Sequence, residues 1–276
     1  MAATEASDAR SSRTMSPLRE LLGARELLRN LTVRELKVRY KRSALGFLWT
    51  LLNPLLMMAV FTVMFTTVFH SPIEWFPIYF LTGYLPFAFF QASVQVGTGS
   101  IIGNGNLVKK VYFPRSVLPI SVVASQVVHL MLGLLVLLVA ETVIFGWDRR
   151  FDWWWYLPVL AFSIAILAVF TTGLTLLLSA ANTYLRDIGE FMTVAFLLWF
   201  YATPVIYDMS QIPARLQWAI KANPLYWFVA LFRSCLYETR LPGLPTVLAC
   251  VGWAAVSLAI GWIVFDRLAA EFAKEV

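Results

Sequence analysis

The sequence is short of charge and of cysteine. Only 14% of its 276 residues are Asp, Glu, Lys or Arg, whereas an average soluble domain has about 25%. The two cysteines, Cys235 and Cys250, are spaced like neither a metal site nor a redox motif, so they are expected to be isolated thiols. These shortages argue against a soluble domain and against a disulfide or zinc scaffold.

Motifs that convert chemical energy are also absent. The chain has no GxxxxGK(S/T) phosphate loop, no HExxH metal motif and no GxSxG nucleophile elbow. His129 lies near the middle of a long apolar run, where an ionisable residue can relay protons. A buried structural hydrogen bond explains a single histidine better than a relay does. Any active transport by this chain is therefore expected to be powered by a partner.

The sequence is rich in hydrophobic residues and in long runs without charge. Hydrophobic residues make up 59% of the chain, the mean hydropathy is +0.71, and several uncharged runs exceed the roughly 20 residues that cross a bilayer as a helix. The sequence predicts an all-α polytopic membrane protein. Its six transmembrane helices are expected at about residues 45–69, 78–102, 117–145, 153–181, 191–207 and 246–265.

Two local features predict departures from plain helices. Asn53-Pro54 falls inside the first span, where proline frees a backbone carbonyl. Gly99 and Gly103, at the end of the second span, have the spacing that permits close contact between two helices.

Residues 208–245 carry too many charges to cross a membrane. The region still contains short apolar pieces, one at about 213–222 and one that starts at Asn223-Pro224, where a capping residue precedes proline at the first helical position. Both are predicted to be re-entrant helices, which dip into the membrane and return.

The N-terminal region is predicted to have two parts. Residues 1–15 are polar, resemble no cleavable signal peptide and are expected to be a disordered tail. Residues 16–42 are expected to form an amphipathic helix at the membrane surface, starting at Ser16-Pro17 and restarting at a capping box from Thr32 to Glu35. The remaining residues, 43–276, are expected to form the transmembrane domain.

Six spans place both termini on one side of the membrane. If that side is cytoplasmic, only six of the 22 lysines and arginines face outward, so the positive-inside rule favours cytoplasmic termini. The six are Arg149, Arg150, Arg215, Lys221, Arg233 and Arg240.

Three motifs resemble those of ABC-2 permeases that export polysaccharides. They are RYKRSALGFLW at 39–49 with LNPL at 52–55, LVKKVYFPR at 107–115, and NPLY at 223–226 with Phe232-Arg233. The resemblance covers the chain from about Arg34 onward. It implies a transport subunit rather than an enzyme, with a second copy of itself and two ABC ATPase subunits as partners. It implies no cofactor in this chain, since ATP and Mg²⁺ belong to the ATPase. The substrate would be a lipid-linked glycan such as O-antigen, capsule or teichoic acid, carried across the bacterial inner membrane.

The resemblance also gives roles to two loops on the cytoplasmic side. The first looks like the coupling helix that seats in the ATPase: Leu107, Val108, Lys109, Lys110, Val111 and Phe113. The second would be a lesser contact, centred on Tyr184, Arg186 and Asp187. Ordinary solvated loops are the alternative, but the apolar residues of the first are unusual in a loop exposed only to water.

Two further sets of residues are candidates for handling the substrate. A basic patch before the first span could bind the pyrophosphate of a lipid-linked glycan. Binding of anionic lipid, or a plain topological anchor, would explain the patch equally well. The patch comprises Arg34, Lys37, Arg39, Tyr40, Lys41 and Arg42. Aromatic rings could stack on sugar rings in a channel, although most aromatics in membrane proteins face lipid; the channel candidates are Phe47, Trp49, Phe61, Phe65, Trp199 and Tyr201.

Three other functions remain open at this stage. The chain could be an ABC-2 permease for a drug or a simple lipid. A membrane-embedded glycan-lipid enzyme would need clustered acidic residues, and only scattered ones occur outside the membrane. A proton-coupled carrier would depend on His129 alone.

Overall fold

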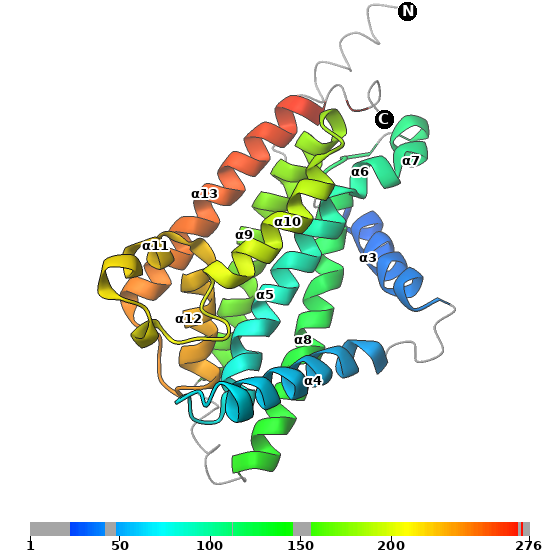
Figure 1. Ribbon diagram of the computed structural model, residues 1–276. Coiled ribbons are helices and arrows are strands. Elements are labelled where there is room, and N and C mark those ends of the chain that lie inside the picture. Colours follow the sequence, from blue (N-terminus) through cyan, green and yellow to red (C-terminus); the bar gives the residue numbers. More distant parts are fainter. Residues whose placement is uncertain (1–22, 42–47, 112, 146–155, 270–271, 273–276) are drawn as a thin grey trace, which may run out of the picture.

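The computed structural model describes residues 23–41, 48–111, 113–145, 156–269 and 272, and all regular secondary structure in these ranges is helical (Figure 1). Six helices correspond in order to the six predicted spans. Four stretches are long and apolar enough to cross a membrane: Leu48–Val68, Val117–Val143, Leu157–Tyr184 and Leu244–Ala269. The all-α architecture is therefore confirmed in the described residues, which contain four long candidate spans and are consistent with a polytopic membrane protein. The six helices are α4 (Leu48–Thr62), α5 (Phe76–Thr98), α8 (Val117–Phe145), α9 (Tyr156–Tyr184), α10 (Ile188–Ala202) and α13 (Leu244–Ala269).

Helix α5 forms the centre of the bundle. It contacts α4, α8, α9, α10 and α12, and most of its residues are buried, among them Phe80, Leu81 and Phe90. A helix enclosed by protein need not be as apolar as one that faces lipid. Its tyrosines and glutamines, Tyr79, Tyr84, Gln91 and Gln95, are therefore compatible with a central position.

Helix α4 lies across α5 and α8 instead of running alongside them (Figure 1). Pro54 is inside this helix, as predicted, and is buried against the bundle. The helix ends in a π-helical stretch, Val63–Val68. The sequence did not predict this widening of the last turns. Most of the α4 surface remains exposed, which suits a helix surrounded by lipid or by another chain.

Close helix contacts use glycines other than the predicted pair. A Cβ atom added at Gly103 would meet nothing within 4 Å, and one at Gly99 would meet only Val96 O at 3.8 Å. Gly99 and Gly103 therefore make no close helix contact within the described part of this chain. The tight contact lies between α9 and α13, where a Cβ at Gly261 would stand 1.9 Å from Gly173 O.

Two ends of the bundle matter for function. The α7 end carries α6 (Ser100–Gly103), α7 (Gly105–Lys110), the turn between α9 and α10, and the last turn of α13; the α12 end carries α11 (Gln217–Ala222) and α12 (Pro224–Leu236) (Figure 1). At the α12 end, Asn223 caps α12 by accepting a hydrogen bond from Leu225 N at 3.0 Å. Its side chain also donates to Ala202 O at 3.1 Å and to Thr203 Oγ1 at 2.9 Å. The predicted cap is therefore confirmed, and it also fastens α12 to the end of α10.

Helix α3 (Arg25–Tyr40) is continuous through the predicted capping box. Thr32 Oγ1 donates to Leu28 O at 2.8 Å, one turn back in the same helix, instead of capping a new one. The predicted restart at Thr32 is therefore wrong. Ser16 and Pro17 lie outside the described residues.

Candidate functional site

The first predicted coupling loop forms the short helix α7. Lys109 and Lys110 at its end are exposed, and so is Val111, with 54% of its surface accessible. Val108 is only 5% exposed, and Leu107 and Phe113 are partly buried. The surface that α7 presents at this end of the bundle is thus mainly basic.

The apolar side of α7 packs within the chain itself. Val108 belongs to a buried cluster with Leu31 of α3 and Phe272, and Leu107 and Phe113 pack against this cluster. Arg115 reinforces the arrangement by donating a hydrogen bond to Ala269 O, with its guanidinium carbon 6.0 Å from the centre of the Phe272 ring. Leu107, Val108 and Phe113, which looked unusual in a solvated loop, therefore have a structural reason to be there, whereas Val111 is exposed.

The second predicted coupling loop lies at the same end. Tyr184 donates its hydroxyl to Leu268 O at 3.2 Å, which ties the end of α9 to the end of α13. Leu185, Arg186 and Asp187 are exposed beside it. Tyr184 is thus a packing residue, while the side chains of Arg186 and Asp187 are at the surface.

A cavity of about 610 Å³ lies between α4, α5 and α8. Its wall combines aromatic rings with uncharged polar groups. Gln95 is held by hydrogen bonds from its Nε2 to Thr193 Oγ1 at 3.1 Å and Gly189 O at 3.3 Å, both at the start of α10. The aromatic wall residues are Trp49, Tyr84 and Phe89, and the polar ones include Asn53, Gln91, Gln95, Gln126 and His129.

His129 fits the structural role that the sequence favoured. Its Nδ1 lies 2.9 Å from Ser125 O, one turn back in α8. A carbonyl oxygen can only accept a hydrogen bond, so Nδ1 is the donor in this contact. The hydrogen bond within the helix accounts for a histidine at this depth without a proton relay.

The cavity suits a neutral, polar ligand with apolar faces. Side-chain amides both donate and accept hydrogen bonds, and the described residues that line the cavity include no Asp, Glu, Lys or Arg. No sequence motif pointed to the three glutamines, Gln91, Gln95 and Gln126. A signal was available, because uncharged polar groups within a long apolar segment need a partner or a function.

Of the six aromatic residues predicted to line a channel, those in the described part of the chain lie in different environments. Trp49 lines the cavity. Phe61 stacks on Phe80 and Phe65 stacks on Phe76, with ring centres 4.6 and 4.9 Å apart, so both belong to the core. The remaining three do not line this cavity: Trp199 donates its indole N–H to Asn223, Tyr201 is exposed, and Phe47 lies outside the described residues.

The residues of the predicted basic patch also differ in their surroundings. Arg34 Nη2 donates to Asn104 Oδ1 at 2.7 Å and to Glu35 Oε1 at 3.0 Å. Lys37 and Lys41 are exposed. Arg39 and Tyr40 end α3, but their side chains are outside the described part of the chain, as is Arg42.

These features define a multi-pass helical membrane protein with a cavity of mixed aromatic and uncharged polar lining, and with two exposed segments at one end. The sequence model of the ABC-2 type transporter family matches residues 26–237. The chain belongs to that family, and the resemblance stated from its motifs is confirmed. As a member it is a transport subunit rather than an enzyme, and ATP and Mg²⁺ bind to a partner ATPase.

Proteins with known roles are similar to this chain over nearly its whole length. An O-antigen export system permease protein of Myxococcus xanthus is 36% identical over 264 residues, which cover 94% of this chain and 98% of the relative. A protein of the same name from Klebsiella pneumoniae is 31% identical, over 90% of this chain and 94% of its own length. A capsule polysaccharide export inner-membrane protein of Neisseria meningitidis is 25% identical, over 79% and 81%.

Proposed function

We propose that this chain is the permease subunit of an ATP-driven transporter that exports a lipid-linked polysaccharide of the O-antigen or capsule type across a bacterial inner membrane. The observation that carries the proposal is the 36% identity to an O-antigen export permease over 94% of this chain. The same similarity disfavours a drug or simple-lipid permease.

The cavity supports a sugar substrate independently. Sugar rings have apolar C–H faces that stack on aromatic rings, and hydroxyl groups that exchange hydrogen bonds with amides. Trp49, Tyr84 and Phe89 offer rings, and Gln91 and Asn53 offer exposed amides, in one wall without fixed charge. Such a surface binds glycan weakly and repeatedly, which suits a chain that must slide.

The proposed assembly has two copies of this chain and two ATPase subunits. Six spans would place both termini and the α7 end in the cytoplasm, with α11 and α12 as re-entrant helices on the outer side. In that arrangement Lys109, Lys110 and Val111 face the ATPase, with Arg186 and Asp187 as the second contact. Lys37 and Lys41 remain candidates for the phosphate of the lipid-linked substrate, together with Arg39 and Arg42.

Loss of the chain tests the transport role. Deleting its gene should remove the polysaccharide from the cell surface and leave lipid-linked glycan inside the cell, and restoring the gene should reverse both effects. Unchanged surface polysaccharide in the deletion strain would contradict the proposal.

The coupling role needs a sharper experiment. Replacing Lys109 and Lys110 with Glu reverses the exposed charge of α7, and the ATPase subunit should no longer co-purify. Lys221→Glu is the matched control, since Lys221 is equally exposed but lies on α11 at the other end. Equal recovery of ATPase with all variants would remove α7 from the contact.

A further inference from the structure

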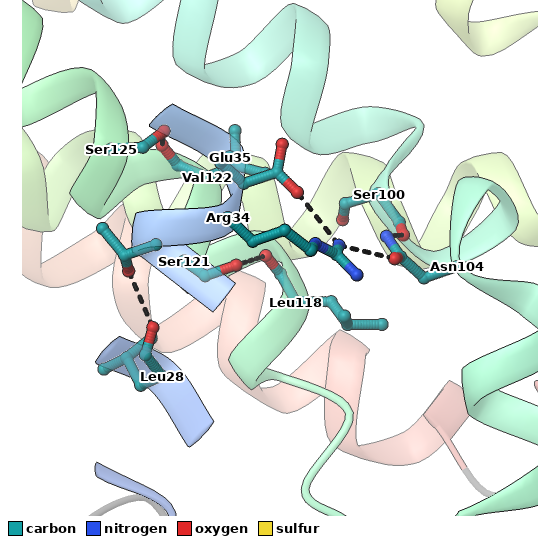
Figure 2. A network of polar contacts seen from close by, with 10 residues as sticks. Leu28, Arg34, Glu35, Ser100, Asn104, Leu118, Ser121, Val122 and Ser125 are labelled. Carbon is teal, nitrogen blue, oxygen red and sulfur yellow. Dashed lines mark hydrogen bonds and ion pairs between the residues drawn. The ribbon is translucent and has the colours of Figure 1, made fainter. Parts of the chain in front are cut away.

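A side chain of the N-terminal helix α3 reaches the coupling segment, which comprises Asn104 and helix α7. Arg34, on α3, donates from Nη2 to Asn104 Oδ1 at 2.7 Å, although 70 positions separate the two residues (Figure 2). Glu35 accepts a second hydrogen bond from the same nitrogen at 3.0 Å. A guanidinium held between two oxygens has a fixed direction, so this contact defines how α3 lies against the coupling segment.

Asn104 stands at the origin of α7. Its backbone carbonyl accepts the first hydrogen bonds of that helix, from Leu107 N at 2.9 Å and Val108 N at 3.1 Å. Its side-chain amide donates to Ser100 O at 2.8 Å, so its Oδ1 is left to face Arg34 (Figure 2). Any shift of α7 therefore moves the atom that Arg34 holds.

The apolar packing around this contact joins the same two elements. Leu31 of α3 and Val108 of α7 belong to one buried cluster, with Val117 and Leu118 at the start of α8. Where α3 rests on α8, Ser121 and Ser125 donate to carbonyls of their own helix, at Leu118 and Val122 (Figure 2). Their hydroxyls are thus satisfied without α3.

We propose that Arg34 is a positioning residue that carries the movement of α7 to α3. The inference rests on the proposed function, in which α7 contacts the ATPase and moves when the ATPase changes conformation. Helix α3 packs against α8, and α8 contributes Gln126, His129 and Leu130 to the wall of the cavity. Arg34 would thereby connect ATP hydrolysis with the wall that contacts the glycan, and it would not bind the lipid phosphate.

The test is a double-mutant cycle on the reconstituted complex of permease and ATPase, supplied with lipid-linked glycan. Arg34→Gln and Asn104→Ala should each lower the glycan exported per ATP by about fivefold, the size of a modest coupling between sites. The double variant should lose no more than either single one, because the two residues act through one contact. Glu35→Gln is the control that leaves the Asn104 contact intact.

Other outcomes would overturn the inference. Losses that multiply to about 25-fold in the double variant would show two independent roles. If Arg34→Gln instead raised the glycan concentration needed for half-maximal ATPase stimulation while Asn104→Ala did not, Arg34 would bind the substrate. Wild-type export per ATP in both single variants would also refute the link.

A second measurement does not depend on the substrate. Amide hydrogen exchange of the assembled complex should show faster exchange in α7 when Arg34 is replaced, and faster exchange in α3 when Asn104 is replaced. If the wild-type complex exported no glycan, the proposed function would fail and this measurement would still decide the link. Exchange that changed only in the substituted helix would refute it.

Discussion

Replacing Arg233 with lysine should destabilise the α12 end, although the charge is kept. Arg233 lies on α12 with only 8% of its surface exposed. Its guanidinium carbon is 3.6 Å from the centre of the Tyr79 ring, and its Nη2 donates to Val205 O at 3.0 Å. These contacts join α12 to α5 and to the loop after α10. Gly83 leaves room for them, because a Cβ there would be 3.0 Å from Nη2.

The magnitude follows from what lysine cannot reproduce. A desolvated cation over an aromatic ring contributes about 2 kcal/mol, and a hydrogen bond from a charged donor contributes about 1.5–3 kcal/mol. Lysine is shorter and has no plane to stack, yet it still bears the cost of burying a charge. We expect Arg233→Lys to lose about 3 kcal/mol of folding free energy. Arg233→Met, which removes the buried charge but also the donor to the Val205 carbonyl, should lose about 1–3 kcal/mol.

The surroundings of Arg233 supply both a second reporter and a control. Burial raises the pKa of Asp208, but its hydrogen bonds with Ser210 and the charge of Arg233 bring it below the ordinary value. The pKa of Asp208 should therefore rise in Arg233→Met. Arg240→Lys is the matched control, since the Arg240 side chain is 71% exposed and pairs only with Glu238 at the surface.

The assay is thermal unfolding of the purified chain in detergent, followed by intrinsic fluorescence. Arg233→Lys should unfold several degrees below wild type and no later than Arg233→Met, while Arg240→Lys should match wild type. A lysine variant as stable as wild type would refute the argument from stacking geometry.

Two other predictions concern the bundle and its orientation. Gly261→Ala should lower the free energy of unfolding by about 3 kcal/mol, the upper range for overpacking, because its Cβ would strike the Gly173 backbone. Gly252→Ala in the same helix is the control, since its Cβ would meet nothing within 4 Å, and it should be neutral. Equal unfolding temperatures of the two variants would contradict this. In a background without the two native cysteines, Glu238→Cys should react with an impermeant thiol reagent in intact spheroplasts, and Lys109→Cys only after lysis; the reverse pattern would contradict cytoplasmic termini.

Helix positions were predicted best from the sequence where they depend on a local signal or on the length of an apolar run that can cross a bilayer. Uncharged runs located the apolar helices within a few residues, and Asn223-Pro224 located the start of α12 because a cap and a proline are local signals. Thr32 and Glu35 match a capping box equally well, but α3 continues because Thr32 bonds back to Leu28. A capping motif permits a helix start but does not require one, because the same threonine can bond to the preceding turn of a continuous helix.

Other features depended on partners that are distant in the chain. The spacing of Gly99 and Gly103 suggests that another helix can approach closely, but it does not identify that helix. A close contact between two glycines is found instead at Gly173 and Gly261. The wall of the cavity likewise combines residues from three helices. Sequence spacing within one helix cannot show that Trp49 shares a wall with residues of α5 and α8.

The packing of α7 determines which experiment can report on coupling. Phe113 packs against the cluster that contains Val108, Leu31 and Phe272, so removing its ring would loosen that cluster whether or not an ATPase is bound. Loss of export in Phe113→Ala would thus have two explanations. Residues of one close-packed cluster are displaced together, so a partner that grips only the exposed Lys109 and Lys110 can still move the whole cluster. Charge reversal at these two lysines leaves the packing intact, which makes it the cleaner test of the coupling surface.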